Sequence, residues 1–427
     1  MTATMSAGPV LRTNWSRVLL TYLAGVLAAA ALGKIGPVFG PIQSDLGLSL
    51  PAVGWAASAM TGVAAALGLI GGVWTDRLGD RRSLLAGLVL LAVTGAAGSL
   101  AWDATSLLVF RLFEGTGYLL VVVAAPALLM RLTTGADRVT ALSVWGTFIP
   151  VGLAVGSGAG GVVAGSSGWR SWFLLLGAGV AVVAVVAAVR LPGPGRPGRY
   201  AGRAGPPGGG AAGGGPDLTV GKPDGHTGGP ATRPRIRAAV LARILALSAG
   251  FGAVSMISVA VLTLLPTFLS TDAGLGSSTA GLAVALVSLV SVPGGIVAGW
   301  LLRRVAGIPV LGPLALTMPF LAVVIFSGPR IPALAIGAAA VLLFVNGILV
   351  AVAFATVPQV VDGADQLGTG NGLLVQLGSC GSLLGPPLFA GTVDRFGWGP
   401  VPVVVGVAAV LGLVLYLIAH RSPAPRR

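Results

Sequence analysis

The chain has 427 residues, of which 55% are hydrophobic and only 9% are charged. Soluble globular proteins carry about 25% charged residues, so this composition excludes an ordinary soluble domain and predicts a protein that crosses a membrane many times. The single cysteine excludes a disulfide framework and a cysteine-based metal site. We expect no cofactor, no metal and no enzymatic activity. We interpret the net charge of +14 as a signal of membrane topology rather than of nucleic-acid binding.

Twelve stretches of the chain are apolar enough, and long enough at ~1.5 Å per residue, to cross a bilayer as helices. The first six are 17–40, 52–75, 83–102, 106–131, 139–164 and 170–190, and the second six are 238–270, 278–302, 308–327, 331–358, 367–391 and 399–420. This pattern predicts an all-α membrane protein with twelve transmembrane helices in two six-helix bundles.

The positive charges alternate between successive loops, as the positive-inside rule requires. On the side of the N-terminus lie Arg12, Arg17, Arg77, Arg81, Arg82, Arg131, Arg138, Arg303, Arg304, Arg421, Arg426 and Arg427, whereas the opposite loops offer only Arg170, Arg330 and Arg395. We therefore expect a multi-pass protein of the cell membrane with both termini in the cytoplasm.

Residues 192–236 interrupt the apolar pattern, since 15 of these 45 residues are Gly and 9 are Pro. Such a segment cannot bury enough apolar surface to offset the entropy lost when it becomes ordered. The sequence therefore predicts an N-terminal six-helix bundle over 1–191, a disordered cytoplasmic linker over 192–236 and a C-terminal six-helix bundle over 237–427.

The two halves of the chain also resemble each other. Gly152, Gly156, Gly168 and Trp169 precede Gly381, Gly385, Gly397 and Trp398 by 229 residues, and Gly54 precedes Gly281 by 227 residues. The longer match shares G-x-x-x-G, eleven residues and then G-W, which chance rarely produces. A parallel repeat of two six-helix halves is typical of transporters that bind their solute between the halves.

The most specific string is GVWTDRLGDRR, which begins at the end of the second predicted span and fills the loop before the third. It closely resembles the loop signature G-x-x-x-D-R-x-G-x-R-R of the major facilitator superfamily. A degraded second copy, GWLLRR at 299–304, has Arg303 at the position of Asp76. With the twelve spans and the central linker, the resemblance covers the whole chain.

The resemblance implies alternating access, in which two bundles rock around a central site, and a cytoplasmic latch at this loop. The latch residues would be Gly72, Asp76, Arg77, Gly79, Arg81 and Arg82, with Asp362 and Asp365 as acidic partners. Asp76 would face the positive end of the eleventh helix near 368–371, while Arg77 or Arg81 would pair with an acidic partner. Anchoring of the loop by its arginines is a second interpretation, compatible with the first.

Two narrower patterns bear on the type of transporter. In proton antiporters a proline follows the glycine repeat of the fifth helix, whereas this chain has Ser157 there. The glycine repeat is therefore better explained by close helix packing than by drug/proton antiport. The stretch RLFEGTGYLLVVVAAPALLMRL, with GKIGP in the first span, is similar to the cyanate/nitroimidazole-type branch. That similarity implies transport of small anions or small organic solutes.

Three charged residues fall inside predicted spans, where charges are costly and usually functional. They are Lys34, Arg111 and Glu114, and Glu114 is the only glutamate of the chain. Two cations against one anion would attract an anionic solute, with Lys34 and Arg111 as substrate-binding residues. In the alternative, Arg111 and Glu114 pair on one helix and Lys34 extends toward the lipid headgroups.

Other polar residues in apolar runs complete the candidate site. Asn346 and Gln376 are assigned to the substrate-binding set, although each can equally bond a neighbouring helix. Glu114 is the only carboxylate predicted within the hydrocarbon, which makes it the candidate proton carrier.

We therefore expect a monomeric secondary active transporter in the lipid bilayer that moves a small organic or anionic solute, with protons as a candidate coupling ion. The alternative within transport is a multidrug-type efflux pump for hydrophobic compounds. A membrane sensor would need a folded signalling domain and a channel would need a polar stripe along a pore, and the sequence carries neither pattern.

Overall fold

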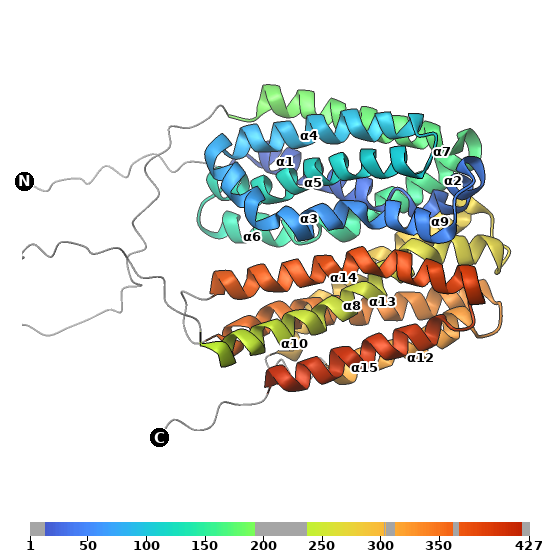
Figure 1. The fold of residues 1–427 in the computed structure, drawn as a ribbon. Helices are drawn as coiled ribbons and strands as arrows, with labels where there is room; N and C mark the ends of the chain where they lie inside the picture. The colour runs from blue at the N-terminus through green and yellow to red at the C-terminus, as the bar shows by residue number, and fades with distance from the viewer. Residues whose placement is uncertain (1–12, 193–236, 303, 305–311, 362–366, 421–427) are drawn as a thin grey trace, which may run out of the picture.

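The computed structural model describes residues 13–192, 237–302, 304, 312–361 and 367–420. Within these ranges the regular structure is helical throughout. The helices lie side by side in two groups, one formed by α1 to α7 and the other by α8 to α15 (Figure 1). Helix α1 begins and α15 ends at the same end of the molecule, which we call the terminal end; the opposite end is the distal end.

The first group contains α1 (Trp15–Gly33), the 3-10 turn η1 (Gly36–Val38), α2 (Phe39–Leu46), α3 (Leu50–Leu78), α4 (Asp80–Ala97), the 3-10 turn η2 (Gly98–Leu100), α5 (Ala104–Leu132), α6 (Gly135–Trp145) and α7 (Phe148–Arg190). The second group contains α8 (Ala238–Thr271), α9 (Ser277–Leu289), α10 (Ser291–Leu301), α12 (Thr317–Phe326), α13 (Pro332–Val360), α14 (Leu367–Phe396) and α15 (Val401–His420). In the described chain, 10 helical stretches are long and apolar enough to cross a membrane, and 312–326 is a shorter apolar helix.

Helix α7 crosses twice, because it folds back at Gly168. Gly168 has φ +81° and ψ 162°, a backbone conformation outside the helical region that a residue with a Cβ rarely adopts. A Cβ atom added to Gly160 would lie 2.9 Å from Nε1 of Trp172, whereas a straight helix would separate these residues by ~18 Å. With α7 counted twice and the shorter helix included, the described chain has the twelve crossings predicted from the sequence.

One predicted boundary differs from the structure, and two predicted spans contain a break in the helix. The span predicted at 139–164 begins inside α6, which is a separate helix that ends at Trp145, and the crossing starts at Phe148. The first crossing loses its α-helical form after Gly33. The 3-10 turn η1 begins at Gly36, and its second residue, Pro37, lacks the N–H that a continuing α-helix needs. The span predicted at 278–302 is confirmed as one apolar stretch, Ser277–Leu301, although its helix is interrupted at Val290 between α9 and α10.

The internal repeat predicted from glycine spacing is present in the packing. Gly156 of α7 lies against the α1 backbone, and Gly385 of α14 lies against the α8 backbone, so closely that a Cβ atom at either position would overlap a carbonyl oxygen. Gly168 and Gly397 both have positive φ, at 81° and 72°. The two halves therefore pack equivalent helices in the same way.

The two helix groups meet through glycines near the distal end. Helix α3 packs against α14, and α7 packs against α9. A Cβ atom added to Gly54 of α3 would lie 2.8 Å from Cα of Pro387, and one added to Gly281 of α9 would lie 2.9 Å from Cα of Gly161. We call these two contacts the distal seams, and they use the repeat-equivalent residues Gly54 and Gly281.

Candidate functional site

Three buried charged side chains of the first helix group bind one another. Lys34 directly follows α1, and Arg111 and Glu114 lie three residues apart on α5, a spacing that places them on one helix face. The Lys34 Nζ is 2.5 Å from Glu114 Oε1, and Arg111 Nη1 is 2.8 Å from Glu114 Oε2. Each side chain is at most 1% exposed. We call these three residues the buried triad.

Arg111 uses every N–H of its guanidinium group inside the protein. Besides Glu114, its acceptors are the carbonyl oxygens of Ala31 at 2.8 Å, Ala56 at 2.9 Å, Ala57 at 3.3 Å and Leu32 at 3.5 Å. The last carbonyls of a helix have no partner within the helix, and a cation there is stabilised by the helix dipole. Arg111 therefore caps the end of α1 and joins it to α3.

Lys34 contacts two further helices. Its Nζ is 3.5 Å from the Gly95 carbonyl oxygen on α4 and 3.8 Å from the centre of the Phe173 ring on α7, the geometry of a cation–π contact. A Cβ atom at Gly95 would lie 2.8 Å from Glu114 Oε1, so only glycine leaves room for the triad. The sequence analysis missed Gly95 and Phe173, since nothing local in the chain signals either contact.

The contacts within the triad can be compared with the two interpretations of these charges drawn from the sequence. The pairing of Arg111 with Glu114 is confirmed, but Lys34 binds Glu114 instead of extending toward the headgroups. In this conformation Arg111 has no free N–H to offer a solute. A substrate-binding role for Lys34 and Arg111 therefore stays a prediction, and it requires a conformation in which the triad opens.

The two other predicted substrate-binding residues lie on the second helix group. Asn346 of α13 accepts a hydrogen bond from the Ser258 hydroxyl of α8 through Oδ1, at 2.6 Å. Gln376 of α14 donates from Nε2 to the Ala65 carbonyl oxygen of α3, at 2.7 Å. Gln376 thus bonds across the two groups, near the middle of both helices.

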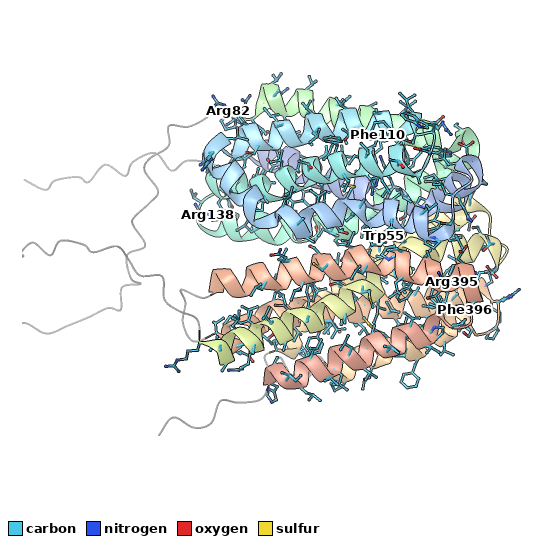
Figure 2. All side chains as sticks on the ribbon, viewed as in Figure 1. Trp55, Arg82, Phe110, Arg138, Arg395 and Phe396 are labelled. Atoms are coloured by element: carbon cyan, nitrogen blue, oxygen red, sulfur yellow. The ribbon has the colours of Figure 1, made fainter. Side chains whose placement is uncertain are left out.

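The predicted latch lies at the terminal end, and the structure describes part of it. Gly79 separates α3 from α4 with φ +82°, which requires glycine. Arg81 donates to the carbonyl oxygens of Ala188 at 2.6 Å and Leu191 at 3.2 Å, at the end of α7. Arg82 is exposed at the terminal end (Figure 2). The Arg81 bonds stay within the first helix group.

The structure describes the remaining latch residues only in part. Gly72 and Asp76 belong to α3, but the structure describes only their backbone, and Arg77 is exposed in the last turn of that helix. Asp362 and Asp365 lie outside the described residues. Their pairing with Arg77 or Arg81 therefore stays a prediction.

An acidic residue of the same string was missed by the sequence analysis. Asp80 of α4 pairs with Arg131 of α5, with 2.8 Å between Oδ2 and Nε, and its side chain is only 8% exposed. Its position directly after Gly79, within the most specific string of the chain, is the signal that could have identified it.

The whole chain was compared with known proteins. Residues 21–375 match the model of the Major Facilitator Superfamily. The puromycin resistance protein of Streptomyces alboniger is 33% identical over 194 residues, which cover 45% of this chain and 38% of that protein. The 3-(3-hydroxy-phenyl)propionate transporter of Escherichia coli (strain K12) is 31% identical over 149 residues, which cover 33% of this chain and 36% of that protein. The chain thus matches less than two fifths of either relative's length.

A solved structure is similar along nearly the whole chain. The bacterial homologue of the human lysosomal transporter Spinster, in an inward-facing and occupied conformation, superposes with a TM-score of 0.76 over 96% of this chain and 97% of that chain. The sequence identity is 16%, so this likeness concerns the fold. The family model, which covers most of the sequence, shows that this integral membrane protein belongs to the major facilitator superfamily.

Proposed function

We propose that the protein is a secondary active transporter that moves a small organic solute across the cell membrane by alternating access. The observation that carries this proposal is the pair of distal seams at the repeat-equivalent Gly54 and Gly281. At both glycines the seams bring backbone against backbone. Such contacts let two rigid helix groups part and close again around a central site.

The proposed orientation follows from the arginines. With both termini in the cytoplasm, the distal seams close the outer side of the membrane, so the described conformation is inward-facing. The inward-facing state of the Spinster homologue, which superposes well, supports this assignment. We propose a monomer in the lipid bilayer with no nucleic-acid partner.

The terminal end would carry the latch of the outward-facing state. There Asp76 would face the start of α14, and Arg77 would pair with Asp362 or Asp365. Arg81 would either join the latch or keep its bonds to the end of α7, which already hold the loop in place. Gly72, Gly79 and Arg82 would shape and anchor the same loop.

Two solute classes are consistent with the site. For an organic anion, Lys34 and Arg111 would release Glu114 and bind the carboxylate, with Asn346 and Gln376 as polar contacts. The relative named for 3-(3-hydroxy-phenyl)propionate transport supports this class. For export of hydrophobic compounds the triad would stay closed, and two observations favour that class: Arg111 is fully bonded, and a relative is named for puromycin resistance.

Counterflow in liposomes tests both classes with the purified protein. The two probes are 3-(3-hydroxyphenyl)propionate and puromycin, each run against protein-free liposomes. Counterflow of the carboxylate supports the first class, and counterflow of puromycin alone supports export of hydrophobic compounds. If folded protein exchanges neither these probes nor any other member of a panel of carboxylates and hydrophobic drugs, the transport proposal is wrong.

Proton coupling can be tested in the same liposomes. The candidate from the sequence is Glu114, and Glu114→Gln would then lose accumulation driven by a pH gradient while it keeps exchange. Full proton-driven accumulation by Glu114→Gln would show that this carboxylate does not carry the proton.

A further inference from the structure

The charge of the buried triad decides which of its members can exchange a proton. Two cations and one anion give the site a net charge of +1. An arginine guanidinium does not lose its proton in proteins, so only Lys34 and Glu114 can change charge. Both are at most 1% exposed, so the cost of any unbalanced charge is not relieved by water.

The two possible changes have opposite effects on this balance. A proton added to Glu114 would leave two buried cations without an anion, which is strongly unfavourable. A proton removed from Lys34 would leave a neutral amine beside the Arg111–Glu114 pair, whose charges cancel. Charge balance therefore favours Lys34 as the group that releases a proton.

The other groups around Lys34 do not alter this charge balance. Helix α4 contributes the carbonyl oxygen of Gly95, and α7 contributes the ring of Phe173. Among the described residues, the charged groups that act on Lys34 are Glu114 and Arg111, both on α5. A neutral amine can still donate to Glu114 and Gly95, so the site keeps its hydrogen bonds when the charge is lost.

The second helix group shows that this fold does not need the triad. Its α8 corresponds to α1 and its α13 to α5, and α8 packs against α13 as α1 packs against α5. Helix α13 contains no charged residue, and the only one in α8 is Arg243, near its start. Because buried ion pairs are weak contributors to stability, the triad is better explained by a function than by folding.

The triad is joined to the contacts between the two helix groups. Two residues after Lys34, Gly36 of η1 meets the α8 backbone, where an added Cβ would lie 3.5 Å from the Thr263 carbonyl oxygen. Arg111 binds the carbonyl of Ala56, two residues after Gly54 of a distal seam. Parting of the helix groups would therefore remove the α8 backbone from Gly36 and the α14 backbone from Gly54, and admit water beside the triad.

We propose that Lys34 is the proton carrier of this protein and that Glu114 stays ionised as the fixed partner of Arg111. When the seams part and water reaches the site, the Lys34 amine takes up one proton from water; when the triad closes and water leaves, the ammonium returns that proton to the departing water and becomes an amine again. The role in transport rests on the proposed function, but the assignment of the proton to Lys34 can be tested without any solute.

The composition of the chain makes this test selective. Its only lysines are Lys34 and Lys222, and Glu114 is its only glutamate. Protein labelled with ¹³C at lysine Cε or at glutamate Cδ, in lipid nanodiscs, therefore gives two lysine signals and one glutamate signal. Lys34→Met and Lys222→Arg assign the lysine signals.

Titration from mildly acidic to alkaline pH should shift the Lys34 signal at lower pH than the Lys222 signal. The Glu114 signal should stay at the position of an ionised carboxylate throughout. A Glu114 signal that moves to the protonated position while Lys34 is unchanged would overturn the proposal, and so would two lysine signals that titrate together. Counterflow by the unlabelled protein is a separate measurement, so failure of the transport proposal and failure of this one are distinguishable.

Discussion

Replacement of Glu114 by Gln should destabilise the protein strongly. Both carboxylate oxygens are bonded to cations, and the side chain is 1% exposed. The substitution leaves Lys34 and Arg111 buried without an anion, and removal of one member of a buried ion pair costs about 3–5 kcal/mol. Because about 1.4 kcal/mol corresponds to a factor of ten, the unfolding equilibrium constant should rise by a factor between about 10² and a few times 10³.

The matched control is Lys34→Met, which removes one cation and leaves the Arg111–Glu114 pair in balance. We expect it to lose far less stability than Glu114→Gln, because the substitution leaves no uncompensated charge in the buried site. Unfolding by increasing SDS, followed by the fluorescence of the nine tryptophans, measures both variants. Equal stability of Glu114→Gln and Lys34→Met would refute the charge argument.

Three other predictions concern the conformational cycle. Gly281→Leu should prevent closure of a distal seam and lower the population of the described conformation. Accessibility of cysteines introduced along the seam measures this, with Gly337→Leu as the control because its surroundings are open. Asp76→Asn should leave expression and folding unchanged but slow counterflow, since a latch that forms in only one state biases the equilibrium between the states. A wild-type counterflow rate in this variant would contradict the proposed latch. Deletion of about 15 residues within 203–225 should leave counterflow unchanged, because a flexible coil of the remaining length, as the composition predicts, would span tens of ångströms. Loss of counterflow in membrane-inserted protein would show that the segment has another role.

The sequence predicted the helices and the family better than it predicted the site. Crossing segments are local features, set by about 20 successive apolar residues, and glycine spacing revealed the repeat because each glycine marks a close helix contact. Boundaries were wrong where a short helix such as α6 adjoins a crossing, since hydropathy does not register the break at Gly146–Thr147.

The candidate site depended on contacts between distant parts of the chain. Sequence alone identified Lys34, Arg111 and Glu114 as costly charges, and the three-residue spacing on one helix predicted the pairing of Arg111 with Glu114. Only the tertiary structure decided that Lys34, 80 residues from Glu114, completes the triad. The packing of α1, α4, α5 and α7 closes the triad off from water, and that packing depends on the shapes of four helices at once. No pattern within a single helix contains that information.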